Sequence, residues 1–158
     1  MPGPILLYRM NDRDKEGIVL MQELESSFDA ICESVAQELG YKVEHDVNLG
    51  AGNIDQVWSR QDHPNMPEMK FAVQIIADAC DVAPNVIGSY AMTSLWTDCD
   101  HLIIVVPDQA TQKSIQGKVR SFDAIGGFLQ LHKYITTITI SELTKGLSEA
   151  TRTTEARA

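Results

Sequence analysis

The amino-acid sequence predicts an α/β fold in which helices pack on a mixed β-sheet. The chain has 158 residues, which is the length of one domain. Its first three apolar strand patterns follow one another with connections too short for a crossover helix, so these strands should form an antiparallel meander. The later strand patterns are separated by helical patterns, which allow parallel pairing through crossover connections. The expected element order is α-β-β-β-α-β-α-β-α.

The first predicted helix begins at Asp12 or Asp14, either of which can cap it, and ends at Leu39. The segment before it contains two prolines and is expected to be extended or irregular. Gly40 follows the helix as a stop signal. Apolar residues recur along the helix at steps of three and four, which is the spacing of one helix face. This apolar stripe consists of Met21, Leu24, Phe28, Ile31, Val35 and Leu39.

Three strands are predicted to follow this helix. Alternating apolar and polar residues over 41–47 predict a half-buried strand. Turn-forming residues over 48–53 separate it from a second strand over 54–58. A loop with two prolines over 60–67 leads to a third strand over 70–77, whose apolar character predicts a central position in the sheet.

The second half of the chain predicts alternating helices and strands. Pro84 stands at or near a helix start, Pro107 closes a buried strand, and Ser141 can cap the final helix. We expect one domain over residues 1–148 and a polar, disordered tail over 149–158. The elements expected before the tail are a helix over 85–96, a strand over 101–106, a helix over 108–120, a strand over 134–140 and a helix over 141–147.

The composition excludes several classes of protein. The longest aliphatic run, Leu102 to Val106, is far shorter than the roughly 20 residues that span a bilayer, so no membrane association is expected. The three cysteines have neither a disulfide framework nor paired metal-ligand spacing, which fits a cytoplasmic location. The motifs of P-loop proteins and serine hydrolases are absent. Gly50 and Gly52 lack the third glycine and the following helix of a dinucleotide-binding loop.

The net charge of −9, taken alone, argues against a nucleic-acid partner, because phosphates would be repelled. The charge is unevenly distributed, however. Residues 1–100 hold 6 Lys and Arg against 17 Asp and Glu, whereas residues 101–158 hold 7 against 5. The uneven distribution is consistent with an ordinary solvated surface. Alternatively, the acidic excess forms a cation site and the basic remainder faces an anionic partner.

Two polar residues stand inside apolar strands. A carboxylate at Asp55 is costly in such a strand unless it is paired or binds a cation. Gln74 stands in the middle of the third strand and shares a face with Ala72 by strand alternation, and we expect it to lie across the hairpin from Asp55. In the alternative interpretation, Asp55 caps the turn before it and Gln74 is hydrogen-bonded in the core. The face expected to meet the core carries Phe71, Val73 and Ile75.

The order of these patterns resembles that of the restriction-endonuclease-like nucleases, the PD-(D/E)xK superfamily, and especially its Mrr-type and archaeal resolvase-type members. Ser27–Asp29 and Leu39–Glu44 resemble the helix and the strand entry of those proteins. Gly52–Trp58 resembles the strand that bears the motif aspartate. Phe71–Gln74 resembles the strand that usually reads Phe-Glu-Val-Gln or Phe-Glu-Val-Lys, and Leu102–Pro107 resembles the strand after the second helix. The resemblance implies a restriction-endonuclease-like mixed sheet.

The resemblance also implies one or two Mg²⁺ ions (or Mn²⁺), held by carboxylates, that activate water for phosphodiester hydrolysis. It makes Asp55 the metal-binding aspartate and puts Gln74 where most members have a lysine. Asp29 matches the acidic residue of the helix, with Glu25 and Glu33 one turn to either side as substitutes.

The central acidic residue of the motif is missing, because Ala72 occupies its position. Alanine cannot bind a metal ion, so the chain as written should be inactive or badly impaired. Three explanations stay open: a variant silenced by a glutamate-to-alanine change, a natural pseudo-nuclease, or a register shifted by two that gives Gln74 the glutamate position and Ile76 the lysine position. A fourth takes Glu68–Lys70 as the motif, although this segment begins its strand and should lie far from Asp55.

The sequence thus predicts a metal-dependent DNA endonuclease in an inactive form, with a non-catalytic α/β interaction or DNA-binding module as the alternative. Cleavage of both strands of a duplex would need two active sites, so we expect a homodimer. Lys113, Lys118 and Arg120 are the candidate phosphate contacts. DNA binding through so limited a basic face should depend strongly on a divalent metal ion.

Overall fold

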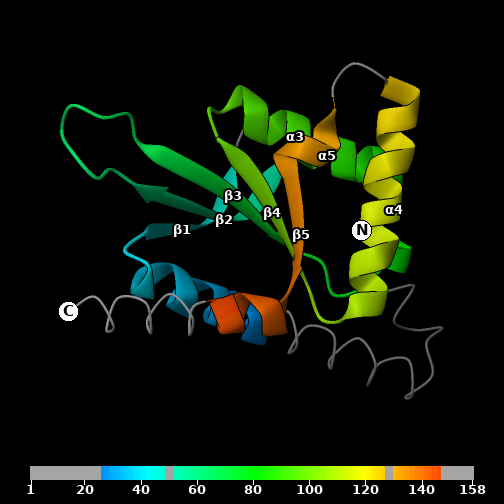
Figure 1. Cartoon of the computed structure of the whole chain (residues 1–158), viewed down its shortest axis with the longest axis horizontal. Helices are drawn as coiled ribbons and strands as arrows, with labels where there is room; N and C mark the ends of the chain where they lie inside the picture. Colours follow the sequence, from blue (N-terminus) through cyan, green and yellow to red (C-terminus); the bar gives the residue numbers. More distant parts are fainter. Residues whose placement is uncertain (1–25, 49–51, 127–129, 147–158) are drawn as a thin grey trace, which may run out of the picture.

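The computed structural model describes residues 26–48, 52–126 and 130–146. Within these ranges, one five-stranded mixed sheet lies at the centre of the molecule, and its strands follow chain order (Figure 1). The predicted α/β class with a mixed sheet is therefore confirmed. The strands are β1 (Lys42–Asn48), β2 (Asn53–Arg60), β3 (Met69–Ile75), β4 (His101–Val106) and β5 (Ile135–Thr139).

The strand directions follow from the lengths of the connections. The first three strands pair antiparallel and are joined by short connections. β4 and β5 join the sheet in parallel, and the helices α3 (Pro84–Trp96) and α4 (Gln109–Gly126) lie in the crossover connections that parallel pairing requires. β3 has two strands on either side, so the predicted central position of the third strand is confirmed.

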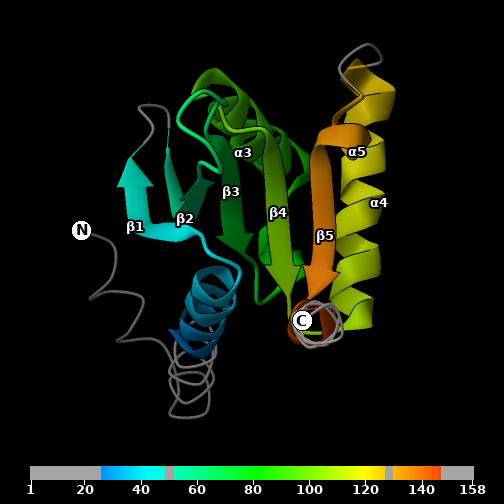
Figure 2. The ribbon, with the colours of Figure 1, turned by 60° about the vertical axis from the view of Figure 1, so that its left-hand side comes forward.

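Helices cover both faces of the sheet, which gives three layers (Figure 2). The helix over residues 26–38 and the helix over residues 140–146 pack on one face. The helices α3, α4 and α5 (Leu131–Tyr134) pack on the other face. Each face carries its own cluster of buried apolar residues. The cluster under the helices over 26–38 and 140–146 includes Phe28, Cys32, Trp58, Val73 and Leu143. The cluster under α3, α4 and α5 includes Ile54, Ala72, Ile87, Ile115 and Leu131.

The prediction of a single core face on β3 needs correction. Val73 and Ile75 are buried as expected, but Ala72 on the opposite face is buried completely. Phe71 is half buried and packs against the same cluster as Val73 and Ile75, as expected. The central strand of a three-layer fold has helices on both sides, so residue alternation does not separate a core face from a solvent face there.

Where the structure describes the end of a predicted helix or strand, the observed end lies within two residues of the predicted one. The exception is the C-terminal end of α4. The start of the first predicted helix and the tail over 149–158 lie outside the described residues. Two short elements were not predicted, the 3₁₀ helix η1 (Ala79–Asp81) and α5.

The helix α4 continues past Arg120 to Gly126 because Phe122 packs against α3. Gly88 of α3 is buried at this contact, and a Cβ atom there would overlap the Phe122 ring. The lack of a side chain at Gly88 therefore allows the two helices to approach closely.

The two unpredicted elements are held by side chains of α4. Lys118 donates hydrogen bonds to the carbonyl oxygens of Ala79 and Val82 at η1. The carboxylate of Asp123 accepts hydrogen bonds from the first two backbone N–H groups of α5, at 2.7 and 3.0 Å. Both elements depend on partners that lie eight residues or more away in the sequence, which local sequence patterns do not reveal.

Candidate functional site

A small pocket of about 280 Å³ opens where the first two strands and the end of β3 meet the helix over residues 26–38. Three carboxylates line it, and each comes from a different element: Asp29 from the helix, Asp46 from β1 and Asp55 from β2. Ser26 and Ile75 complete the lining. We call this the acidic pocket.

Asp55 is held at the end of the β2–β3 ladder by two hydrogen bonds to β3. Its backbone N–H donates to Oε1 of Gln74 at 3.3 Å, and its Oδ2 accepts from the backbone N–H of Ile75 at 2.8 Å. The register pairs Gln56 with Val73, so Asp55 and Gln74 lie across from each other. The predicted pairing of Gln74 across the hairpin from Asp55 is confirmed.

Asp46 lies across the β1–β2 ladder from Asp55. The ladder pairs the residues on either side of the two aspartates, which leaves the aspartates opposite each other. Asp46 also has a φ of 49°, in the left-handed region that few side chains adopt. Like charges in opposite positions of an antiparallel pair are destabilising. A cation between the two carboxylates would relieve this repulsion.

His45 connects β1 to the helix over residues 26–38. Its Nδ1 lies 3.2 Å from Oδ2 of Asp29, and its Nε2 lies 3.1 Å from Oε2 of Glu33. Partial burial lowers the pKa of His45, but the hydrogen bond to Glu33 and the charges of Asp29, Glu33 and Asp46 outweigh it, so the pKa is raised above its ordinary value. Glu33 is thereby occupied by a protein partner. Glu25, the other substitute helix acid, lies outside the described residues.

A buried amide fixes the position of Asp29. Gln56 is completely buried, and its Nε2 donates to both the backbone oxygen and Oδ1 of Asp29, each at 2.8 Å. Its Oε1 accepts a hydrogen bond from Nε1 of Trp58 at 2.8 Å. The orientation of the Asp29 carboxylate is therefore set by the core beneath it.

Two groups beside the acidic pocket respond to its negative field. Burial raises the pKa of the Cys32 thiol to about 12, and the charges of Asp29 and Asp55 contribute to the rise. Burial also raises the pKa of Tyr90 on α3, with a contribution from the charge of Asp55. Both groups are therefore neutral at physiological pH, and the field around the pocket favours a cation.

The spacing of the carboxylates limits the kind of metal site that can form. Within the described ranges, no three Asp, Glu, His or Cys side chains are grouped closely enough to hold a metal ion. The acidic pocket is therefore wider than a closed coordination shell. Mg²⁺ commonly keeps several waters and binds through one or two carboxylates, and the donor set of the acidic pocket fits that mode of binding.

Ala72 lies away from the acidic pocket, although it shares a face of β3 with Gln74. It is completely buried, opposite Val57 of β2 and beside Leu102 of β4. The surrounding cluster is apolar. A glutamate at this position would therefore have to extend toward the pocket or a cation to be tolerated.

Glu68, the alternative motif residue, lies at the other end of β3. The register pairs Met69 with Arg60, whereas Asp55 lies beside Gln74. At a rise of about 3.3 Å per residue, Glu68 and Gln74 are roughly 20 Å apart along the chain direction. The prediction that Glu68 lies far from Asp55 is therefore confirmed.

The candidate phosphate contacts lie on α4, beside β5 at the sheet edge opposite β1 (Figure 2). Lys113 and Arg120 are exposed. Lys118 donates to the carbonyl oxygens of Ala79 and Val82 instead, so its ammonium has a structural role. The structure brings Asp29, Asp55 and Gln74 together and leaves the cationic residues at a separate location.

Three residues in or beside the acidic pocket were not predicted from the sequence as candidate site residues: Asp46, His45 and Gln56. Gln56 is a polar residue inside the same apolar strand as Asp55, and this signal could have identified it. Asp46 and His45 lie on an edge strand, where polar residues are ordinary and carry no such signal.

Protein-family models, curated proteins and solved structures were compared with the chain, and none of them matches it. No helix in the described part of the chain combines the length and the apolar composition that crossing a bilayer requires. The functional argument therefore depends on the chemistry of the acidic pocket and its surroundings.

Proposed function

We propose that this chain is a restriction-endonuclease-like, DNA-binding protein that uses a divalent cation and is catalytically silent. The observation that carries this proposal is the contact between Asp55 and Gln74 on the second and third strands of the sheet. The restriction-endonuclease-like motif needs an aspartate and a polar residue at those two positions. The parallel strand that follows through a helix is also in keeping with that architecture.

Mg²⁺ or Mn²⁺ is the class of cation that the acidic pocket supports. Hard divalent cations prefer oxygen ligands, and three carboxylates line the pocket. A bound ion would supply electrostatic stabilisation of a phosphate group. The protein supplies the orientation, because the Ile75 amide holds the Asp55 carboxylate and Gln56 holds Asp29.

The proposal that the protein is catalytically silent is supported by Ala72, which stands where the motif has a carboxylate. Gln74 can donate and accept hydrogen bonds, but it carries neither the charge of a glutamate nor that of a lysine. The alternative function, a non-catalytic interaction or DNA-binding module, is favoured by the complete burial of Ala72 in an apolar cluster. In that function the cation serves binding alone.

Lys113 and Arg120 are the proposed contacts to DNA phosphates, and Lys118 is left out because η1 occupies its ammonium. On a chain with a net charge of −9, these two side chains and a bound cation offset the repulsion of a phosphate backbone. A homodimer would present two acidic pockets to the two strands of a duplex.

Titration with Mn²⁺, measured by calorimetry, tests the cation site. We expect the wild-type protein to bind Mn²⁺ and Asp55→Asn to bind at least about tenfold more weakly, because a ligand charge is lost. Glu68→Gln removes the same charge at the far end of β3 and should leave the affinity unchanged. Equal affinities for all three proteins would overturn the proposal.

Restoring the motif glutamate tests the nuclease assignment. We expect Ala72→Glu to cleave plasmid DNA in the presence of Mg²⁺, whereas the isosteric Ala72→Gln should not. Circular dichroism shows whether each variant is folded, since a buried carboxylate is costly. A folded Ala72→Glu protein that binds Mn²⁺ and does not cleave DNA would favour the non-catalytic alternative.

A further inference from the structure

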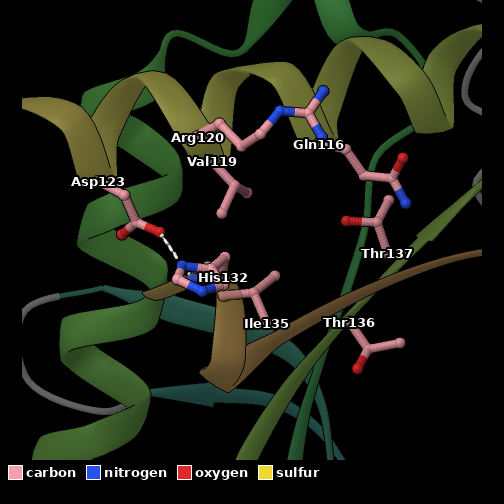
Figure 3. A pocket seen from close by; sticks show the side chains of 8 residues that line it. All are labelled: Gln116, Val119, Arg120, Asp123, His132, Ile135, Thr136 and Thr137. Atoms are coloured by element: carbon pink, nitrogen blue, oxygen red, sulfur yellow. Dashed lines mark hydrogen bonds and ion pairs between the residues drawn. The ribbon is translucent and has the colours of Figure 1, made fainter. Parts of the chain in front are cut away.

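A second pocket, of about 590 Å³, lies between α4 and β5, at the sheet edge away from the acidic pocket (Figure 3). Its volume is within the range of small-molecule sites. Val119 and Ile135 form an apolar floor, and both are buried. We call this the α4–β5 pocket. The polar residues that line it are Gln116, Arg120, Asp123, His132, Thr136 and Thr137.

Three polar side chains of the α4–β5 pocket have no hydrogen-bond or ion-pair partner among the described residues: Gln116, Arg120 and Thr137. Gln116 and Arg120 are one turn apart on α4 and share a face. Thr137 comes from β5, is only 8% exposed, and faces the same opening as Gln116 (Figure 3). Thr136 points away, and its hydroxyl lies 2.5 Å from Nε2 of His101.

Asp123 fixes the position of His132 at the end of the pocket. Its carboxylate accepts hydrogen bonds from the backbone N–H groups of Leu131 and His132 and lies 2.6 Å from Nδ1 of the His132 ring. Burial would raise the pKa of Asp123, but the hydrogen bonds from His132 and Leu131 outweigh it and lower the pKa. The charge of Asp123 is thereby compensated, and Nε2 is the ring nitrogen of His132 left for a ligand.

We propose that the α4–β5 pocket binds a phosphomonoester group. The guanidinium of Arg120 forms a charged fork that suits phosphate, and the amide of Gln116 and the hydroxyl of Thr137 add neutral donors. Nε2 of His132 is a further polar atom at the end of the pocket. This many donors match the three terminal oxygens of a phosphomonoester better than the two of a carboxylate. The apolar floor has room for the group that carries the phosphate.

The proposal shares Arg120 with the proposed DNA contacts but needs neither the acidic pocket nor a cation. Calorimetric titration with phenyl phosphate in the presence of EDTA therefore tests it separately. We expect a Kd on the order of 1 mM or tighter. If phenyl phosphate does not bind but Mn²⁺ does, the phosphomonoester site is refuted and the proposed function is unaffected. If phenyl phosphate binds but Mn²⁺ does not, the proposed function is refuted and the phosphomonoester site is unaffected.

Three variants identify the contacts. Arg120→Ala removes an exposed side chain, and Thr137→Val keeps the buried shape but loses the hydroxyl, so we expect each to weaken phenyl phosphate binding at least about tenfold. Lys145→Ala removes an exposed cation from the helix over residues 140–146 and should leave the Kd unchanged. Thermal melting confirms that the variants are folded. Absence of binding to the wild-type protein, or equal weakening by all three changes, would overturn the proposal.

Two sources of the phosphomonoester are distinguished by the choice of probe. Preference for a 5′-phosphorylated oligonucleotide over the same oligonucleotide with a 5′-hydroxyl, lost in Arg120→Ala, would identify a nucleic-acid end. Binding of phenyl phosphate without that preference would identify a small molecule. Both results support the site. Benzoate or phenol binding as tightly as phenyl phosphate would contradict it.

Discussion

The substitution Asp46→Asn removes one of the two opposed carboxylates of the acidic pocket. Asn has nearly the same shape as Asp and tolerates the left-handed φ of 49° at this position, so the backbone should be unchanged. The charge of Asp46 also acts on His45, so the repulsion within the pocket is best measured at a pH where His45 carries little charge. Without a divalent cation, we expect the variant to be more stable than the wild-type protein.

The magnitude follows from the positions of the two aspartates. Two unit charges roughly 6 Å apart repel by about 0.7 kcal/mol in bulk water and by about 3 kcal/mol at an effective dielectric constant of about 20. Asp46 is exposed and Asp55 is half buried, so a value near the lower figure applies. We expect a gain of about 0.5–1 kcal/mol in the free energy of unfolding, or about 2–3 °C in Tm.

Urea denaturation in EDTA at about pH 9, well above the ordinary pKa of histidine, measures this difference with the contribution of His45 reduced. In the same measurement with Mg²⁺, we expect the wild-type protein to be more stable than Asp46→Asn. The wild-type protein should gain stability by binding the ion, and Asp46→Asn should gain less.

The control is Glu68→Gln, which removes one negative charge from an exposed position outside the acidic pocket. A gain in stability of equal size in Glu68→Gln would mean that net charge, and not the opposed pair, causes the effect. Loss of stability in Asp46→Asn without Mg²⁺ would refute the account of Asp46 and Asp55 as an opposed pair of like charges.

Three further changes test other parts of the structure. Gly88→Ala should lower the free energy of unfolding by about 1–3 kcal/mol, because the new methyl overlaps the ring of Phe122, and Phe122→Leu in the same chain should recover part of the loss in urea denaturation. Lys118→Met should cost about 1–2 kcal/mol in the same assay, since two carbonyl oxygens at η1 lose a charged donor. The raised pKa of His45 means that its ion pairs stabilise the folded protein fully below about pH 6.5, and that this contribution is lost as the pH rises through the raised folded-state pKa. Unfolding measured across this range should show a decline that His45→Gln reduces, and an unchanged pH profile in His45→Gln would contradict the role of His45 in joining β1 to the helix over residues 26–38.

Much of the fold could be predicted because connection length and apolar pattern decide it. The short connections around the second strand allow only antiparallel pairing, and the helices in the later connections allow parallel pairing. The missed features depend on contacts between distant residues. The end of α4 needs Gly88 opposite Phe122, and α5 needs the carboxylate of Asp123.

The candidate site could be predicted only in part, for a similar reason. Asp55 and Gln74 stand out because a polar residue in a buried strand needs a partner, and each partly satisfies the other. Asp46 gives no such signal, because its importance comes from the ladder register and its positive φ. The α4–β5 pocket also gives no signal, because 16 residues separate Arg120 from Thr137 in the sequence.

The central claim, a cation-dependent DNA-binding protein, is tested most directly by the affinity for duplex DNA. Fluorescence anisotropy with Ca²⁺ or with EDTA, each at two salt concentrations, gives both the cation dependence and the salt slope. We expect binding that requires Ca²⁺, that weakens steeply with salt, and that is reduced in Asp55→Asn. Absence of binding, or binding that neither Ca²⁺ nor salt changes, would contradict the claim and favour a protein-interaction module.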